Sequence, residues 1–202
     1  PDGIYVDATA GMGGHSLALC QQLGPAGKLI AIDWDETNLA QAKKQLDQYQ
    51  NQIIFVNNNF ANIGGILNDL SIDFVDGIIV DLGLSREQLL SPERGFSFRA
   101  EGPLDMRINR TTALTAGGII NQYEEKELAD IYFQFGEERW SRKISRVIIR
   151  QRAIKPIATT TELAGLVHRA VPGYHQKINS ATRVFQSLRI VVNSELDNLT
   201  RF

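Results

Sequence analysis

Cysteine is scarce in this chain and long apolar runs are absent. Cys20 is the only cysteine of the 202 residues, so neither an internal disulfide nor a cysteine-based zinc site can form. Its neighbours Leu19 and Leu23 predict that it packs in a core. No apolar stretch approaches the roughly 18 residues that span a bilayer, and the N-terminus lacks the pattern of a secretory signal. With 43% hydrophobic residues, the chain is typical of a soluble, cytoplasmic globular protein without membrane partners.

Histidine is also rare, which bears on metal binding. His15, His168 and His175 are scattered through the chain without the spacing of metal ligands. We therefore expect no resident metal ion, and we interpret His168 and His175 as structural residues.

The net charge is small but unevenly distributed. At -2 it argues against a strongly basic nucleic-acid-binding protein. Residues 1–85, however, hold 3 Lys/Arg against 10 Asp/Glu, whereas residues 86–202 hold 18 against 13. The chain therefore has an acidic first part and a basic second part.

The first 81 residues alternate between β-like and helix-like segments. This alternation predicts an α/β fold, in which a Rossmann-like parallel sheet brings the strand C-termini to one edge, where ligands bind. The apolar middles of the strands predict that both faces of the sheet are covered. The predicted strands are Ile4–Asp7, Lys28–Asp33, Gln52–Val56 and Val75–Asp81, and the predicted helices are Ser16–Leu23, Glu36–Tyr49 and Ala61–Leu70.

The rest of the chain has a different character. Residues 82–112 lack periodicity, and a loop of this length predicts a lid or a substrate-binding loop. The pattern beyond residue 113 is helical, with caps at Thr159–Thr161 and a helix closed by Pro172. We therefore expect an α/β domain at residues 1–104 and an all-helical domain at 105–202. The predicted helices are Glu124–Phe135, Glu137–Ala153, Glu162–Val171 and Ala181–Thr200.

A glycine-rich loop follows the first predicted strand. It reads Asp7-Ala-Thr-Ala-Gly11-Met-Gly13-Gly14-His15-Ser16 and leads into a helix. Glycines at such a turn let the backbone approach a ligand closely, although an ordinary tight turn is the alternative. Ser16 occupies the third glycine position of a dinucleotide fingerprint, which favours S-adenosylmethionine (SAM) over NAD.

Acidic residues end three of the four predicted strands. Asp33 follows Gly13 by 20 residues, where a carboxylate can accept hydrogen bonds from both ribose hydroxyls. Asp81 is placed to orient an amino group of the cofactor or of a substrate base. Together with Asp7 they predict one constellation at the ligand edge. Phe60, after the third strand, is interpreted either as an adenine contact or as core.

Six longer motifs carry a family resemblance that spans nearly all of the chain. The sequence resembles the bacterial 16S ribosomal RNA cytosine-N4 methyltransferases. The resemblance implies a class I SAM-dependent fold with an inserted helical substrate-recognition domain, and methylation of a cytidine N4 amine in the decoding region of the small-subunit RNA. The motifs are Asp7–His15, Asp81–Gln88, Pro92–Phe98, Gly102–Arg107, Gly136–Arg139 and Ala181–Arg189.

The same resemblance assigns cofactor contacts by position. Two departures occur: Ser85-Arg-Glu-Gln88 replaces the usual Ser-Ser-Pro-Gln, and Met12 replaces a small or polar residue. Further sheet strands are expected beyond Phe202 and a short segment before Pro1, so the chain is read as a fragment. The implied SAM contacts are Gly13, Gly14, His15, Asp33, Phe60, Asp81 and Gln88.

The implied chemistry is a direct transfer, in which the amine attacks the SAM methyl group in line. No covalent nucleophile is required. The motif of DNA amino-methyltransferases is absent, so hydrogen bonding of the amine by Asp81, as the catalytic residue, is a hypothesis.

Arginines indicate where RNA would bind. Arg94, Arg99, Arg107 and Arg110 follow the long loop and are predicted to neutralise phosphates of 16S rRNA or the small ribosomal subunit. A second basic row, at 139, 142, 143, 146 and 150, is either an RNA contact or a solvated helix face. Phe133, Phe135 and Trp140 are interpreted as helical core rather than stacking platforms.

Three further questions stay open at this point. A homodimer is possible. An NAD-dependent dehydrogenase fits the sheet but not Ser16, and a non-catalytic ribosome-assembly factor that senses SAM would share every binding residue. Turnover on RNA separates this last alternative from the enzyme.

Overall fold

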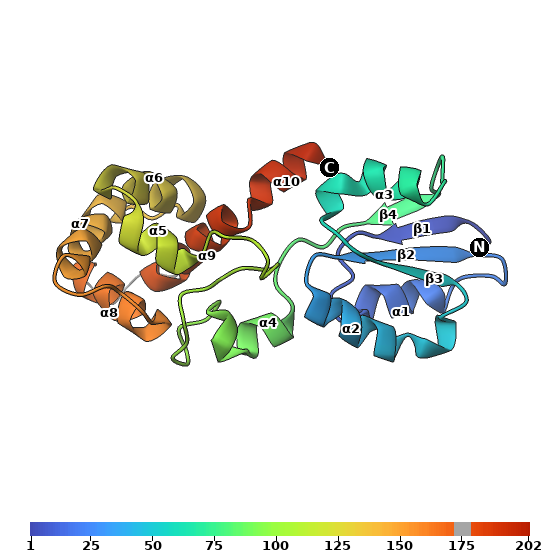
Figure 1. The fold of residues 1–202 in the computed structure, drawn as a ribbon, viewed down its shortest axis with the longest axis horizontal. Coiled ribbons are helices and arrows are strands. Elements are labelled where there is room, and N and C mark those ends of the chain that lie inside the picture. The colour runs from blue at the N-terminus through green and yellow to red at the C-terminus, as the bar shows by residue number, and fades with distance from the viewer. Residues whose placement is uncertain (172–178) are drawn as a thin grey trace. The chain divides into compact units, whose positions relative to one another are not determined.

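A computed structural model describes residues 1–171 and 179–202; the predicted helix end at Pro172 and the predicted structural role of His175 lie outside the described residues. The chain divides into two compact units. The first comprises Pro1–Ser85 and Leu196–Phe202, and the second Arg86–Glu195 (Figure 1). The second unit is therefore inserted into the first, as the sequence predicted. The division falls after Ser85 rather than after residue 104.

The first unit is built on a parallel sheet, which confirms the α/β prediction. Its strands are β1 (Ile4–Asp7), β2 (Lys28–Asp33), β3 (Ile53–Asn57) and β4 (Gly77–Ile79), in the order β3-β2-β1-β4. All three neighbouring pairs are parallel, so the strand C-termini lie along one edge.

Helices cover both faces of this sheet. α1 (Gly14–Cys20) and α2 (Glu36–Gln45) pack on one face, and α3 (Ile63–Asp69) packs on the other (Figure 1). The first face is filled by a cluster that includes Cys20, Ala42 and Leu46, which confirms the core prediction for Cys20. The second cluster includes Val6, Ile30, Ile32 and Ile66. This two-sided burial explains the apolar strand centres.

Two predicted elements of the first unit are shorter than expected. β4 ends at Ile79 because the backbone N–H of Asp81 donates to Thr9 Oγ1 at 2.7 Å instead of continuing the ladder. The predicted helix Glu36–Tyr49 divides into α2 and a 3₁₀ turn at Asp47–Tyr49. Another 3₁₀ turn, Phe60–Asn62, precedes α3.

The second unit is helical. Two of its helices, α4 (Arg86–Leu90) and α5 (Ala116–Gln122), were not predicted. The predicted helix Ala181–Thr200 is interrupted at Asn193 and Ser194, with Ser194 at a φ of 49°. A separate helix, α10 (Glu195–Arg201), follows, and from Leu196 on it belongs to the first unit. The remaining helices are α6 (Glu125–Gly136), α7 (Ser141–Arg152), α8 (Thr160–Ala170) and α9 (Ser180–Val192).

The long segment before α5 belongs to the helical unit, which explains the early boundary. It contains α4 and a 3₁₀ turn at Pro92–Arg94, and Leu104 and Met106 are buried. The backbone N–H of Gly102 donates to Thr160 Oγ1 at 3.1 Å, and Pro103 forms a bridge with Thr159. These contacts contradict the lid interpretation, because they fix the segment to α8.

Within the described residues, no helix combines the length and the apolar character that a membrane crossing needs.

Candidate functional site

Asp33 lies where β2 ends, and it organises the ligand edge of the sheet. Its Oδ2 accepts the backbone N–H of Gly11 at 2.6 Å, and its Oδ1 accepts that of Asp35 at 2.7 Å. The carboxylate therefore ties the glycine-rich loop to the start of α2. A carboxylate has about four lone pairs; these two bonds and a third from the Asn38 side chain use three of them, so one acceptor position is left for a ligand.

The environment of Asp33 also shifts its protonation. Burial raises the pKa of this carboxyl to about 6, although the backbone N–H groups of Asp35 and Gly11 favour the ionised form. Asp33 thus titrates close to neutrality, in a range where an ordinary aspartate is fully ionised.

The three glycines of the loop have different roles. Gly11 and Gly13 have φ values of 53° and 94°, a left-handed conformation that favours glycine. A Cβ at Gly13 would also lie 3.1 Å from Leu46 Cδ1. Gly14 is exposed, and a Cβ there would meet no atom within 4 Å. Gly13 is therefore required by the fold, whereas Gly14 leaves open space for a ligand.

The prediction that Asp7 joins Asp33 and Asp81 at the ligand edge is wrong. Its side chain is fully buried, and its Oδ2 accepts the Ser16 hydroxyl at 2.6 Å while Oδ1 accepts the backbone N–H of Thr9 at 3.2 Å. Asp7 holds the loop from within, and it cannot reach a ligand at the surface.

Asp81 and His15 meet at the same edge. They come from the loops after β4 and β1, and His15 Nδ1 lies 4.0 Å from Asp81 Oδ2. The side chain of Asp81 is 67% exposed and that of His15 is 53% exposed. Both side chains are therefore open to a ligand, and their contact with SAM stays a prediction.

Phe60 and Gln88 are positioned differently. Phe60 packs against the second core cluster, and its ring meets that of Phe202 edge-on, with centroids 5.5 Å apart. Core packing of Phe60 is thus observed, and the adenine contact stays a prediction. Gln88 is buried on α4 in the other unit.

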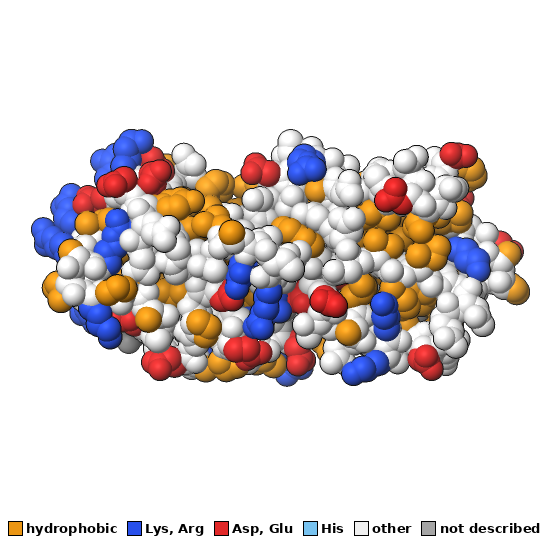
Figure 2. All heavy atoms as spheres, viewed as in Figure 1, with side chains coloured by type: hydrophobic (Ala, Val, Ile, Leu, Met, Phe, Trp, Pro, Cys, Tyr) orange, Lys and Arg blue, Asp and Glu red, His pale blue; other side chains and the backbone are white. Residues whose placement is uncertain are grey.

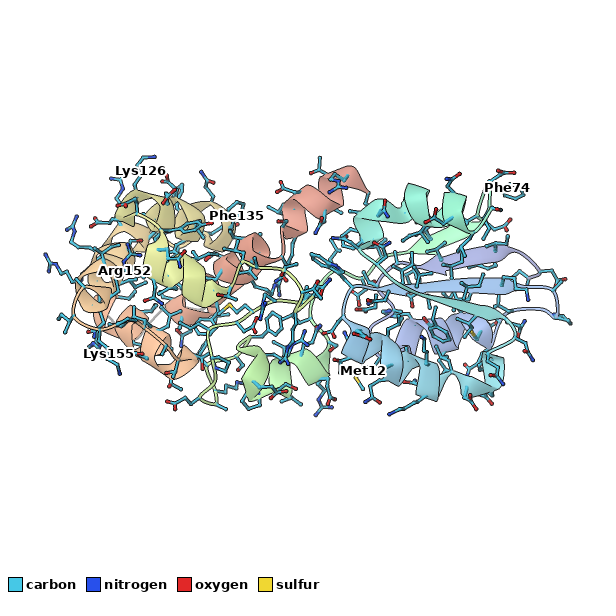
Figure 3. All side chains as sticks on the ribbon, viewed as in Figure 1. Met12, Phe74, Lys126, Phe135, Arg152 and Lys155 are labelled. Carbon is cyan, nitrogen blue, oxygen red and sulfur yellow. The ribbon has the colours of Figure 1, made fainter. Side chains whose placement is uncertain are left out.

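Sequence reasoning missed several residues that hold this edge. Asn38, which is buried, donates a side-chain hydrogen bond to Asp33, and its Oδ1 accepts the Ser85 hydroxyl at 3.2 Å. The side chain of Asp35 caps α2, because its Oδ1 accepts the backbone N–H of Thr37 at 3.0 Å. The pattern Asp35-Glu-Thr-Asn38 is a recognisable helix start that could have drawn attention to these residues. Met12, labelled in Figure 3, projects from the glycine-rich loop.

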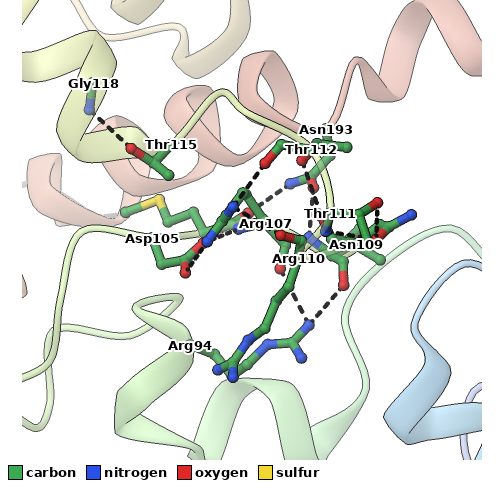
Figure 4. A network of polar contacts seen from close by, with 12 residues as sticks. Arg94, Asp105, Arg107, Asn109, Arg110, Thr111, Thr112, Thr115, Gly118 and Asn193 are labelled. Atoms are coloured by element: carbon green, nitrogen blue, oxygen red, sulfur yellow. Dashed lines mark hydrogen bonds and ion pairs between the residues drawn. The ribbon is translucent and has the colours of Figure 1, made fainter.

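Arg94 and Arg107 are committed to contacts inside the helical unit (Figure 4). Arg107 binds both oxygens of Asp105 at 2.7 and 2.9 Å and also donates to the carbonyls of Arg110 and Thr112. Although burial alone would raise it, hydrogen bonds from Arg107 lower the pKa of Asp105. Arg94, which is buried, donates to the carbonyls of residues 107 and 108. A phosphate contact by either would have to compete with these bonds.

The other basic residues predicted to contact RNA are exposed. Arg99 and Arg110 are exposed, and so are the basic residues at 142, 143, 146 and 150 of α7. Basic side chains gather over the outer side of α6 to α8, interspersed with acidic ones (Figure 2). Residues Leu196–Phe202 add one Asp and one Arg to the first unit, so the units carry -7 and +5.

The prediction that Phe133 and Trp140 are core residues is wrong. Phe133 is 63% exposed and Trp140 is 38% exposed, because the buried aromatic of α6 is the neighbouring Tyr132. Phe135, labelled in Figure 3, is half-buried. His168 Nε2 lies 3.0 Å from Asn179 Oδ1 at the start of α9, in keeping with a structural role.

A family model and several curated proteins are similar to this chain. A family model described as the MraW methylase family matches residues 1–202. Curated proteins named ribosomal RNA small subunit methyltransferase H are similar to the chain: one from Clostridium botulinum (strain 657 / Type Ba4) is 49% identical over 201 residues, and one from Desulfotalea psychrophila is 43% identical over 203. These alignments cover 99% and 100% of this chain and 65% and 69% of the relatives. The chain thus spans about 65% of the length of the first of them.

Proposed function

Because the chain belongs to the MraW methylase family, we propose that its first unit binds SAM and that the protein methylates the N4 amine of a cytidine in 16S rRNA. The observation that carries this proposal is the arrangement of Asp33 with the glycine-rich loop. A half-buried carboxylate holds the loop in place and keeps acceptor capacity for a ribose hydroxyl. The relatives' names support RNA as the substrate.

The residues at the ligand edge suit the parts of SAM. Gly14 leaves open space where the methionine portion can pass close to the backbone, Gly13 gives the loop its left-handed turn, and Asp33 accepts a ribose hydroxyl. His15 and Asp81 present polar groups where the amino acid portion and the methyl group would lie. Phe60 and Gln88 complete the set, and their contacts with SAM rest on the family resemblance.

The raised pKa of Asp33 predicts a pH dependence of cofactor affinity. Hydroxyl donors favour the ionised carboxylate, so bound SAM keeps Asp33 ionised, whereas the free protein takes up a proton near pH 6. Affinity should therefore be constant above about pH 7 and fall by up to about tenfold per pH unit below 6. Calorimetric titrations between about pH 5 and 8 measure this, and an Asp47→Asn variant, altered at an exposed acid, should behave as the parent. A flat profile over that range would show that Asp33 does not contact the ligand.

The chemistry requires alignment and removal of one proton. SAM supplies an electrophilic methyl group, and the cytidine N4 lone pair must point at it in line. Asp81 lies at the exposed edge, where its carboxylate can accept a hydrogen bond from the amine and orient that lone pair. The hydrogen bond between its backbone N–H and Thr9 fixes the position of the residue.

Replacing Asp81 by asparagine should lower turnover by about a hundredfold, because the amide cannot take up the proton of the amine. Transfer of a labelled methyl group from SAM to small-subunit RNA by the full-length protein measures this, with SAM affinity determined separately. Asp73→Asn, at an exposed acid after α3, is the matched control. Full turnover at unchanged SAM affinity would remove Asp81 from the mechanism.

We assign RNA binding to the helical unit. Its net charge of +5, with Arg99 and Arg110 exposed on the long segment, favours contact with phosphates. Arg94 and Arg107 shape that segment through the bonds described above. The role of these two arginines in RNA binding would then be indirect.

A further inference from the structure

An open pocket lies wholly within the helical unit, where α6 ends and α7 begins. Its volume is about 940 Å³, which suits a ligand of nucleotide size. Residues 133–140 form most of its wall, and Arg183 of α9 completes it. None of the cofactor residues predicted from the sequence belongs to this wall.

Glu138 is the buried polar group of the pocket wall. It is fully buried, and its Oε1 accepts the backbone N–H of Trp140 at 2.8 Å. Its Oε2 is also buried and has no hydrogen-bond partner among the residues that the structure describes. A buried carboxylate oxygen without a donor is costly, so this atom is suited to accept an N–H group from a ligand.

The backbone fixes Glu138 in this position. Its N–H donates to the carbonyl of Tyr132 at 3.0 Å, and the preceding Glu137 adopts a left-handed φ of 49°. Gly136 allows α9 to approach, since a Cβ there would lie 2.6 Å from the carbonyl oxygen of Arg183. The pocket is therefore built by the Gly136-Glu-Glu-Arg139 motif and α9 together.

Aromatic and cationic side chains also lie at this pocket. Phe133 and Trp140 line the pocket and are exposed, whereas the neighbouring Tyr132 is buried. Arg139 is exposed, and Lys143 Nζ lies 5.7 Å from the Trp140 ring centroid. Exposed aromatic rings beside cations are typical of sites that stack a base and hold its phosphate.

We propose that this pocket binds one nucleotide of single-stranded RNA, with an amino-bearing base directed at Glu138. The proposal rests on the proposed function in taking RNA as the partner. The exocyclic amine of adenine, cytosine or guanine can donate to Oε2 while the ring stacks on Phe133 or Trp140. Arg139 and Arg183 supply positive charge for the phosphate, and Arg183 is held at the pocket by its hydrogen bond to the carbonyl of Glu137 at 2.7 Å. Uracil offers one ring N–H between two carbonyl oxygens, which the carboxylate would repel.

Fluorescence of Trp140 tests this directly. The chain has two tryptophans, so Trp34→Phe leaves Trp140 as the single reporter. Titration with oligoadenylate should give saturable quenching. Binding should be at least tenfold tighter than for AMP, because neighbouring phosphates add contacts, and at least tenfold tighter than for oligouridylate. Equal affinity for AMP and oligoadenylate would identify a free nucleotide as the ligand, and no saturable quenching would overturn the site itself.

Variants locate the contact. In the same background, Glu138→Gln should weaken oligoadenylate binding at least tenfold, since the amide places a donor where Oε2 stood. Glu93→Gln, at an exposed acid outside the pocket, should leave it unchanged. Phe133→Ala alters only an exposed side chain and should weaken binding by about tenfold. If Glu138→Gln and Phe133→Ala both bind like Glu93→Gln, the proposal is wrong.

These measurements need neither SAM nor methyl transfer. Loss of the quenching signal alongside intact methylation would reject the pocket and leave the proposed activity standing. Quenching that follows the predicted pattern without methyl transfer would do the reverse.

Discussion

Replacing Asp33 with alanine is expected to weaken SAM binding by at least about a hundredfold. One hydroxyl donor to a carboxylate contributes roughly 1.5–3 kcal/mol, which corresponds to about 10- to 150-fold in affinity, and loss of the loop anchor adds to this. The substitution also removes the acceptors for the N–H groups of Gly11 and Asp35, so the loop loses its anchor to β2. Isothermal titration calorimetry with SAM measures the effect.

The matched control is Asp47→Ala, which removes an exposed acid beyond the end of α2. Its SAM affinity should stay within about twofold of the parent, in line with a solvated surface charge. Circular dichroism of both variants separates loss of the ligand contact from loss of the fold. Unchanged affinity in a folded Asp33→Ala protein would mean that the cofactor, if bound, lies elsewhere.

The second large effect is expected for Gly95→Ala, which should destabilise the helical unit by more than about 3 kcal/mol. Gly95 has a φ of 70°, a left-handed conformation that costs other residues about 1–2 kcal/mol. A Cβ there would also overlap the carbonyl oxygen of Pro103. At about 2–4 °C per kcal/mol, the melting temperature should fall by roughly 10 °C.

Gly165→Ala is the control within the same unit. It lies inside α8, and its Cβ would meet only Arg169 Nη1, at an ordinary contact distance of 3.7 Å. Alanine is favoured over glycine in a helix by about 0.5–1 kcal/mol, so this variant should melt slightly higher than the parent. Thermal unfolding followed by circular dichroism compares the two. Equal melting temperatures would show that the Pro92–Phe98 motif does not brace the helical unit.

The sequence predicted the sheet well because burial of strands leaves a direct trace in composition. β1 and β2 match their predicted bounds, since both strands lie between two core clusters. The end of β4 could not be predicted, because it depends on Thr9, a residue 72 positions away that binds the N–H of Asp81. α5 contains Gly117 and Gly118, which are typical of loops, and the packing of Ile119 and Ile120 overrides that preference.

The site was predictable in its position and less so in its details. Parallel strands had to bring Asp7, Asp33 and Asp81 to one edge. That arrangement could not predict that Asp7 is buried and accepts the Ser16 hydroxyl. The hydrogen bonds from Arg107 to the backbone carbonyls of Arg110 and Thr112 could not be predicted either, because every residue type carries such a carbonyl. Helical periodicity also cannot choose between adjacent aromatics, and the structure buries Tyr132 while exposing Phe133.

The most direct test of the account is the chemical identity of the product. Full-length protein would be incubated with SAM carrying a labelled methyl group and with small-subunit RNA, and the digested nucleosides would be separated by mass spectrometry. The account predicts labelled N4-methylcytidine, formed with the parent and lost with Asp33→Ala. Label on another nucleoside or another atom of cytidine, or its absence from RNA under conditions in which the parent binds SAM, would contradict it.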